Sequence, residues 1–291
     1  MGPALRWRCP RSSDRPCNVR PLQQWHHQQK AGPVFTLLIV GCAFLGLAIG
    51  SFLNVVIYRV PRHLSIVRPR SACPACHAQI LDRDNIPVIS WLLLKGRCRS
   101  CGATISPRYP LIELTCSGLF AGTAARVGVN WALPALLVMM ASLLALAAID
   151  LELMVLPKRI IYPSLGAMAV ILTGAAAYYH EWHRLEIAAA CAGSWFLIFF
   201  LLNLISPRAL GFGDVRLSPL LGLGLGWFGI RYVILGFFTA NLVGAVVGVT
   251  LIAMKKMKRN QPIAYGVFLA IGAGIAVFAG PTLLTPFEGF H

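Results

Sequence analysis

The stretch WALPALLVMMASLLALAAID, residues 131–150, is apolar over almost its whole length and ends on a single carboxylate. A helix needs roughly 20 apolar residues to cross a bilayer core of about 30 Å, so this stretch predicts a membrane span near 131–149. Seven other stretches of similar character are predicted to span the membrane as well. They lie near 34–57, 110–126, 160–178, 186–205, 216–228, 231–254 and 264–285. We therefore expect an all-α, polytopic membrane helical bundle of about eight transmembrane helices.

The overall composition supports a membrane protein. Hydrophobic residues make up 57% of the 291 residues, charged residues 12%, and the mean hydropathy is +0.69. A soluble domain carries about 25% charged residues, so this chain cannot cover a water-facing surface. The net charge of +16 alone would fit a nucleic-acid binder. Such a protein needs its basic residues on a folded polar face, and the apolar excess argues against that class of partner.

The distribution of lysine and arginine predicts which side of the membrane each loop faces. The loop at 58–109 is rich in basic residues: Arg59, Arg62, Arg68, Arg70, Arg83, Lys95, Arg97, Arg99 and Arg108, against Asp82 and Asp84. A second basic loop follows the seventh span and holds Lys255, Lys256, Lys258 and Arg259. Six crossings separate the two loops, so both lie on one side, and the positive-inside rule makes that side the cytoplasm.

Residues 1–33 are also basic, although the parity of the spans places them on the opposite side. This segment has no hydrophobic periodicity and is predicted to be a disordered tail. It is not predicted to be part of a signal peptide, because the apolar run after it is about 24 residues long and has no A-x-A-like exit. Our hypothesis is that the natural start lies near Val34 and that the tail is a start-site artefact.

The cysteines of the 58–109 loop form two C-x2-C pairs. Cys73 and Cys76 make the first pair, Cys98 and Cys101 the second, and 21 residues separate the pairs. Each pair can present two thiolates from one tight turn, and two such turns complete a tetrahedral sulfur shell for zinc. A reducing cytoplasm disfavours disulfides, while a redox pair remains the alternative. Four cysteine ligands leave no open position, so we expect a structural rather than a catalytic zinc.

Two aspartates border the predicted spans at the same membrane face. Asp150 ends the third span and Asp214 begins the sixth, so two spans lie between them. Two facing carboxylates in a poorly solvated site share one proton, which makes one a base and the other an acid. Such a pair can activate water against a peptide carbonyl and protonate the departing amine. The alternatives are that Asp214 only caps its helix and that Asp150 is simply hydrated. Because the pair titrates jointly, neither is assigned as the base.

Other polar groups give weaker signals. Asn54 and Glu113 lie at the same face as the aspartates and could line a site or join helices by hydrogen bonds. Gly46 and Gly50 form a small-xxx-small step that favours close packing. The segment His180-Glu181-Trp182-His183 is one residue short of H-E-x-x-H and lies at the opposite face, which argues against a zinc protease.

Longer motifs resemble the type IV prepilin peptidases, which are bifunctional leader peptidase/N-methyltransferases. The motifs that carry this resemblance are GSFLNVVIYRVP at 50–61, CPAC at 73–76, DNIP at 84–87, GRCRSC at 96–101, ISPRYPLIEL at 105–114, Ile149-Asp150 with Leu156-Pro157, and GFGD at 211–214. Together they cover about residues 34–285. The sequence departs from the family pattern in three places: Lys158 stands where the family usually has an acid, Arg216 stands where Lys is common, and Ala264–Ala270 reads AYGVFLA where the family has PFGPFLA.

The resemblance implies a concrete activity. Enzymes of this family cut the basic leader of type IV prepilins or pseudopilins on the cytoplasmic side and then methylate the new amino terminus with S-adenosylmethionine. Asp150 and Asp214 fall on the family's two protease aspartates. The four cysteines fall on its cytoplasmic domain. The implied setting is type IV pilus assembly or type II secretion at the inner membrane, with membrane lipids as further partners.

The predicted organisation is a tail at 1–33, a first span at 34–57, a cytoplasmic zinc-binding loop at 58–109 and a membrane aspartic peptidase domain at 110–291. Two other functions remain open at this point. One is a G-x-G-D intramembrane protease without methyl transfer, and the other is a proton-coupled transporter.

Overall fold

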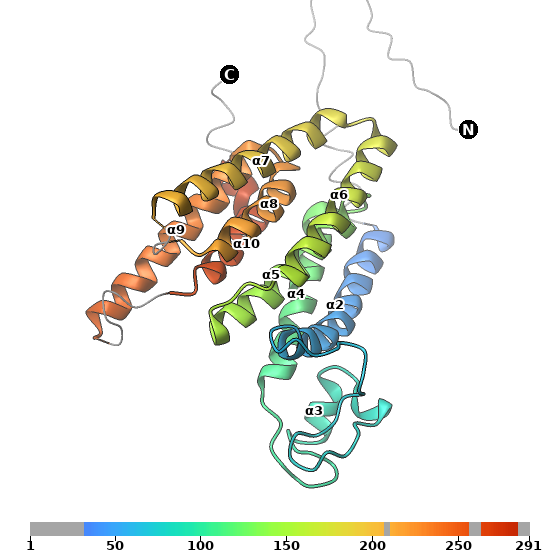
Figure 1. The fold of residues 1–291 in the computed structure, drawn as a ribbon. Helices are drawn as coiled ribbons and strands as arrows, with labels where there is room; N and C mark the ends of the chain where they lie inside the picture. Colours follow the sequence, from blue (N-terminus) through green and yellow to red (C-terminus); the bar gives the residue numbers. More distant parts are fainter. Residues whose placement is uncertain (1–31, 207–209, 256–262, 285–291) are drawn as a thin grey trace, which may run out of the picture.

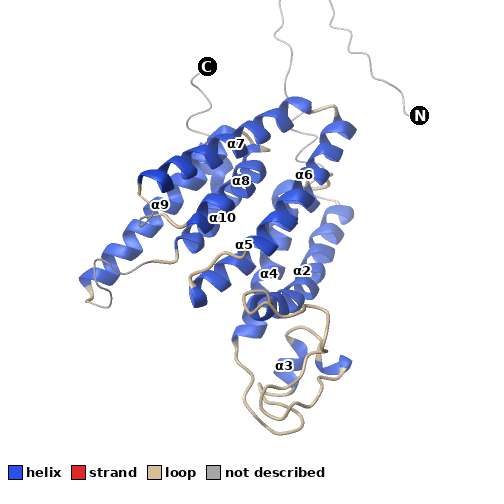
Figure 2. Ribbon diagram, viewed as in Figure 1, coloured by secondary structure: helices blue, strands red, loops and turns tan. Residues whose placement is uncertain are grey.

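The computed structural model describes residues 32–206, 210–255 and 263–284. Over these ranges the regular structure is helical, and two isolated β-bridges are the only extended pairings. Figure 2 shows a bundle of long helices with one loop-rich unit at its end. The all-α prediction is confirmed.

A helix lies at each of the eight predicted stretches. The helices are α2 (Pro33–Arg59), α4 (Arg108–Val127), α5 (Leu133–Leu153), α6 (Lys158–Tyr179), α7 (Trp182–Ile205), α8 (Phe212–Gly226), α9 (Ile230–Ala253) and α10 (Tyr265–Leu284). Six of them, all except α4 and α8, are long and apolar enough to cross a membrane. Helix α8 has only 15 residues, and α4 carries two arginines and a glutamate. The number of eight spans therefore stays a prediction.

Glycines let neighbouring helices approach closely. A Cβ atom on Gly46 would lie 2.6 Å from the Cα of Ser117, and one on Gly50 would lie 2.7 Å from the Cα of Glu113. Helix α2 therefore packs directly against the backbone of α4, as expected for small residues at helix interfaces in lipid. Gly222 on α8 approaches the Cα of Ala192 on α7 in the same way, at 2.7 Å.

Helix α5 lies at the centre of the bundle and ends just after Asp150. More than half of its most apolar window is buried, the largest such share among the six candidate spans. Asp150 lies in its last turn, and Met154 ends the helix in the left-handed conformation with its N–H bonded to the Asp150 carbonyl. The chain then reverses through Leu156 and Pro157 into α6. Helices α8 and α10 both pack against α5 (Figure 1).

The segment between α2 and α4 forms the loop-rich unit, which we call the cysteine loop (residues 60–107). It contains a 3-10 turn, η1 (Asp82–Asp84), and a short helix, α3 (Ile89–Leu93). Figure 1 shows it beside the ends of α2 and α4. The tail predicted at 1–33 lies outside the described residues apart from its last two, and so do Lys256, Lys258 and Arg259.

Candidate functional site

The two C-x2-C segments of the cysteine loop fold in the same way. In the first, the Cys73 N–H bonds to the Ala78 carbonyl and the His77 N–H to the Cys73 carbonyl, both at 2.9 Å. The second repeats these bonds 25 positions later: Cys98 N–H to the Ala103 carbonyl at 2.8 Å and Gly102 N–H to the Cys98 carbonyl at 2.9 Å. His77 and Gly102 both have positive φ, so His77 serves to close a turn.

The four cysteine sulfurs meet at one place. All four lie within 4.8 Å of one another, and the Sγ atoms of Cys73 and Cys101 are 3.8 Å apart. In a tetrahedral zinc site with Zn–S bonds of about 2.3 Å, the sulfurs are separated by about 3.8 Å. The residues therefore fit a zinc ion, and the set of Cys73, Cys76, Cys98 and Cys101 could hold one with no open coordination position.

Backbone N–H groups lower the pKa of two of the four thiols. The N–H groups of Cys76 and Ala75 lower the pKa of Cys73 to about 6. The N–H groups of Cys101 and Ser100 lower the pKa of Cys98 in the same way. Because the thiolate is the form that binds metal, the lowered pKa values of Cys73 and Cys98 favour metal binding through these two sulfurs at neutral pH. The pKa of Cys101, beside the other three thiols, is instead raised to about 11.

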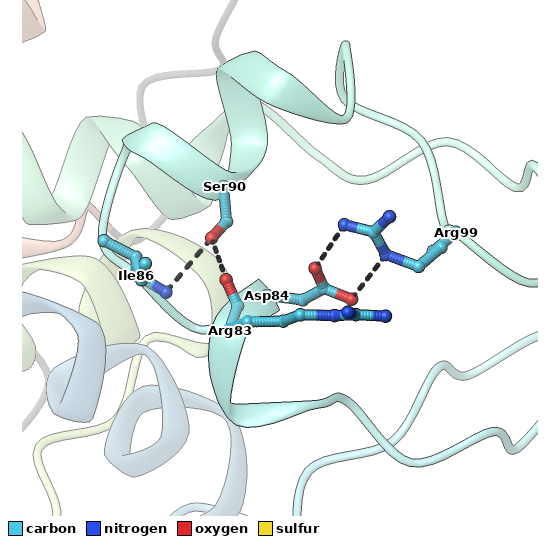
Figure 3. Close-up of polar contacts among 5 residues, drawn as sticks. All are labelled: Arg83, Asp84, Ile86, Ser90 and Arg99. Atoms are coloured by element: carbon cyan, nitrogen blue, oxygen red, sulfur yellow. Dashed lines mark hydrogen bonds and ion pairs between the residues drawn. The ribbon is translucent and has the colours of Figure 1, made fainter.

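An ion pair ties the second cysteine turn to the rest of the loop (Figure 3). Arg99, between Cys98 and Cys101, donates from Nε and Nη2 to the two carboxylate oxygens of Asp84 at 2.9 and 2.6 Å. The bonded Arg99 guanidinium holds the pKa of Asp84 below its usual range. Figure 3 also shows the Ser90 hydroxyl accepting the Ile86 N–H and donating to the Arg83 carbonyl, both at 3.1 Å. The ion pair and the Ser90 bonds therefore link the cysteine turn, η1 and α3.

Two buried polar residues join the loop and the membrane helices. The Glu113 carboxylate on α4 accepts the N–H of Val88, at the start of α3, at 2.7 Å. Asn54 on α2 donates from Nδ2 to the carbonyl of Tyr109 on α4 at 3.1 Å. Of the two roles considered for Asn54 and Glu113, the contacts support the joining of helices.

The two aspartates come together at one end of the bundle. Asp150 is 5% exposed and Asp214 is 7% exposed, and their carboxylates are close enough to repel each other. The Asp150 carboxylate faces the backbone N–H groups of Gly266 and Val267, in the first turn of α10. The Asp214 carboxylate faces the N–H of Gly211, just before α8. Helix N-termini stabilise negative charge, which offsets part of the cost of burying these groups.

Small residues and one leucine shape the space around the pair. A Cβ atom on Gly266 would lie 2.9 Å from Asp150 Oδ2 and about as close to Leu156, and one on Gly213 would lie 3.0 Å from the Leu156 Cβ. Leu156 therefore packs between Gly213, which precedes Asp214, and Gly266, which lies against Asp150. Sequence reasoning did not assign this packing role to Leu156 or to Gly266, because neither residue type indicates chemistry.

One oxygen of each carboxylate accepts no hydrogen bond from the described residues. Asp150 Oδ2 and Asp214 Oδ1 are buried and have no hydrogen-bond partner among the described residues. Tyr265 lies near Asp214 as well, and its hydroxyl donates to Asn241 Oδ1 at 3.2 Å. The arrangement therefore offers two carboxylate oxygens to a water molecule or a peptide. The sequence pattern gave no signal for Asn241.

The histidine segment at the other end of the bundle has a different character. His183 Nδ1 lies 3.8 Å from Glu186 Oε2, and Arg184 pairs with Glu181 at 3.4 Å, at the start of α7. These are local surface contacts of the kind that contribute little to stability.

Comparison with known proteins identifies two matching families. Residues 44–127 match the bacterial peptidase A24 N-terminal domain, and residues 137–249 match the type IV leader peptidase family. No solved structure shows a significant match to the chain.

Several similar proteins carry the name prepilin leader peptidase/N-methyltransferase. One from Stutzerimonas stutzeri is 33% identical over 279 residues, covering 87% of this chain and 95% of that protein. One from Aeromonas hydrophila is 35% identical over 265 residues, covering 81% and 89%. One from Burkholderia pseudomallei (strain 1026b) is 36% identical over 297 residues, covering 90% and 93%.

We predict that the purified protein contains one zinc ion per chain and that Cys98→Ser loses it, because three sulfurs no longer close the shell. Metal analysis of the protein in detergent checks this. Cys42→Ser, which changes a buried thiol of α2 far along the chain from the loop, serves as the control and should keep the metal. A wild-type protein without zinc would contradict the prediction.

Proposed function

Since this chain belongs to the type IV leader peptidase family, we propose that it removes the leader of type IV prepilins or pseudopilins and N-methylates the new amino terminus. The matched family and the names of the relatives support the class of enzyme, a prepilin leader peptidase with N-methyltransferase activity. The observation that carries the peptidase chemistry is the buried carboxylate pair with its two unpartnered oxygens.

Asp150 and Asp214 are the proposed catalytic residues. One carboxylate removes a proton from water as the water oxygen bonds to the scissile carbonyl carbon. The other, protonated, gives its proton to the departing amine as the C–N bond breaks. The water has then supplied a hydroxyl to the leader and a hydrogen to the new amino terminus, and the pair again holds one proton. A site with little water strengthens these interactions.

The pair and the cysteine loop belong to the same end of the bundle. Arg108, the first residue of α4 after the loop, forms an ion pair with Glu152, two residues beyond Asp150. If the basic loop faces the cytoplasm, as the positive-inside rule predicts, leader cleavage takes place there. The protein is then a multi-pass inner-membrane enzyme, and the leader of a prepilin meets the carboxylate pair at this face. The organisation proposed from the sequence, with a first span, a loop at 58–109 and a peptidase domain at 110–291, fits this activity.

Zinc and a methyl donor complete the proposal. Zinc held by the four cysteines would stabilise the loop and take no part in bond cleavage, because its shell is closed. S-adenosylmethionine is the proposed methyl donor, and no residue is assigned to its binding. The arginines and lysines of the loop would contact anionic lipid headgroups. The relatives' names combine both activities, which favours the bifunctional enzyme over a protease without methyl transfer and over a proton-coupled transporter.

We expect Asp150→Asn and Asp214→Asn each to reduce leader cleavage at least about 100-fold, the lower range of what acid–base catalysis contributes. The assay measures cleavage of a prepilin in proteoliposomes, and the amount of each variant in the membrane is measured alongside. Glu186→Gln, at the opposite end of the bundle, is the matched control and should cleave normally. Full cleavage by either aspartate variant would refute the catalytic role of the aspartate pair.

Gly266→Ala should reduce cleavage roughly tenfold or more, because the added methyl group meets Asp150 Oδ2 at 2.9 Å and must displace it or Leu156. Gly274→Ala is the matched control on the same helix, since nothing lies within 4 Å of its added Cβ. Initial cleavage rates and thermal melting are compared for both. Equal rates for the two variants would contradict the close packing against Asp150.

Methyl transfer should survive loss of the peptidase. The Asp214→Asn variant, given a peptide that already lacks its leader, is expected to transfer labelled methyl from S-adenosylmethionine at the wild-type rate. The reason is that the two reactions break different bonds and need different groups. Loss of methyl transfer in this variant, with the fold retained, would mean that both activities use Asp214.

A further inference from the structure

Helix α3 of the cysteine loop presents apolar side chains outward. Ile89, Leu92 and Leu93 are 54%, 61% and 77% exposed, whereas Ser90 is 7% exposed. The Trp91 indole N–H turns inward and bonds to the Ile105 carbonyl at 3.1 Å. A helix on a water-exposed loop would bury its leucines and expose its serine. In α3 the apolar side chains are exposed and the serine is buried, which is the opposite distribution.

The start of α3 is hydrogen-bonded to a residue within the membrane helices. Val88, directly before α3, bonds to Glu113, which is five residues into α4 and so about 7 Å along that helix from its first residue. The Cα of Glu113 lies against Gly50 of α2. Gly50 precedes Arg59, the last residue of α2, by nine residues, or about 13 Å along the helix axis. The Val88 N–H is thus held by a side chain whose Cα lies inside the bundle, beside Gly50 of α2.

Exposed apolar residues of α4 occur at the same level. Leu111 and Leu114 flank Glu113 and are both more than half exposed. In a helix of a membrane bundle, such residues face lipid. Figure 1 shows the cysteine loop at one end of the bundle, directly next to the ends of α2 and α4.

Basic residues border α3. Arg83 precedes the helix, Lys95 and Arg97 follow it, and all three are exposed. Residues 58–109 contain nine Lys and Arg against Asp82 and Asp84, a difference of seven positive charges. Asp84 is already paired with Arg99. An apolar helix with a basic border is complementary to a bilayer surface that carries anionic headgroups.

We propose that α3 is a membrane-surface anchor. Ile89, Leu92 and Leu93 enter the boundary between headgroups and acyl chains, and Arg83, Lys95 and Arg97 meet anionic headgroups. The cysteine loop then has two attachments to the membrane part of the protein, the Glu113–Val88 hydrogen bond and the lipid itself. This inference needs only that the bundle spans a membrane, so it stands or falls independently of the peptidase activity.

Photo-crosslinking in a bilayer tests the anchor directly. Benzoylphenylalanine replaces Leu93 in the full chain, which is then reconstituted in nanodiscs of phosphatidylethanolamine and phosphatidylglycerol. The same substitution at Ser100, an exposed position between two cysteines of the loop, is the matched control. Intact-protein mass spectrometry after irradiation should show several-fold more lipid adduct from position 93 than from position 100. Phosphatidylglycerol should be over-represented among the adducts relative to its share of the bilayer.

Zinc content and thermal melting establish that both variants are folded. If the variant labelled at position 93 does not fold, the crosslinker is placed at position 92 instead. Three results would overturn the anchor. They are the absence of lipid adducts from the α3 position, equal adducts from both positions, and crosslinks from α3 to a second copy of the chain in place of lipid. Adducts that show no preference for phosphatidylglycerol would overturn the role of the basic border.

Discussion

Burying two carboxylates within an apolar bundle is the constraint on which the structure depends. Asp150 and Asp214 are almost fully buried, and each would be strongly disfavoured without compensation. The compensation comes from helix ends: the first N–H groups of α10 face Asp150, and the N–H of Gly211 before α8 faces Asp214. Three helix termini must therefore meet at one point. Gly213 and Gly266 allow this, because any larger residue would collide with Leu156 or Asp150.

Buried polar contacts also hold the cysteine loop to the bundle. Glu113 is buried on α4, and its acceptor is used by the Val88 backbone. Inside the loop, the Asp84–Arg99 pair fixes the second cysteine turn to η1, and Ser90 fixes η1 to α3. A metal at the four sulfurs would close this chain of contacts. The loop is therefore held at two places, at its cluster of four sulfurs and at its hydrogen bond to Glu113 of α4.

Hydropathy was sufficient to place the helices, because a span in lipid must be long, apolar and internally hydrogen-bonded. Every predicted stretch holds a helix whose ends differ from the prediction by at most four residues. The parity of the spans also indicated one face for Asp150 and Asp214. The sequence could not reveal that Leu156 packs between Gly213 and Gly266, or that Glu113 accepts a backbone N–H from the loop. Such contacts depend on how helices are rotated about their axes, and hydropathy does not report rotation. The apolar residues of α3 give no sequence signal either, because five residues are too few to show a periodic pattern.

Asp150 and Asp214 are proposed to activate water directly, with no covalent bond between enzyme and leader. A single turnover with a synthetic prepilin in water enriched in oxygen-18, quenched rapidly in the presence of hydroxylamine, tests it most directly. We expect one heavy oxygen in the new carboxylate of the leader and no leader hydroxamate. Capture of the leader as a hydroxamate would reveal an acyl-enzyme and contradict direct attack by water.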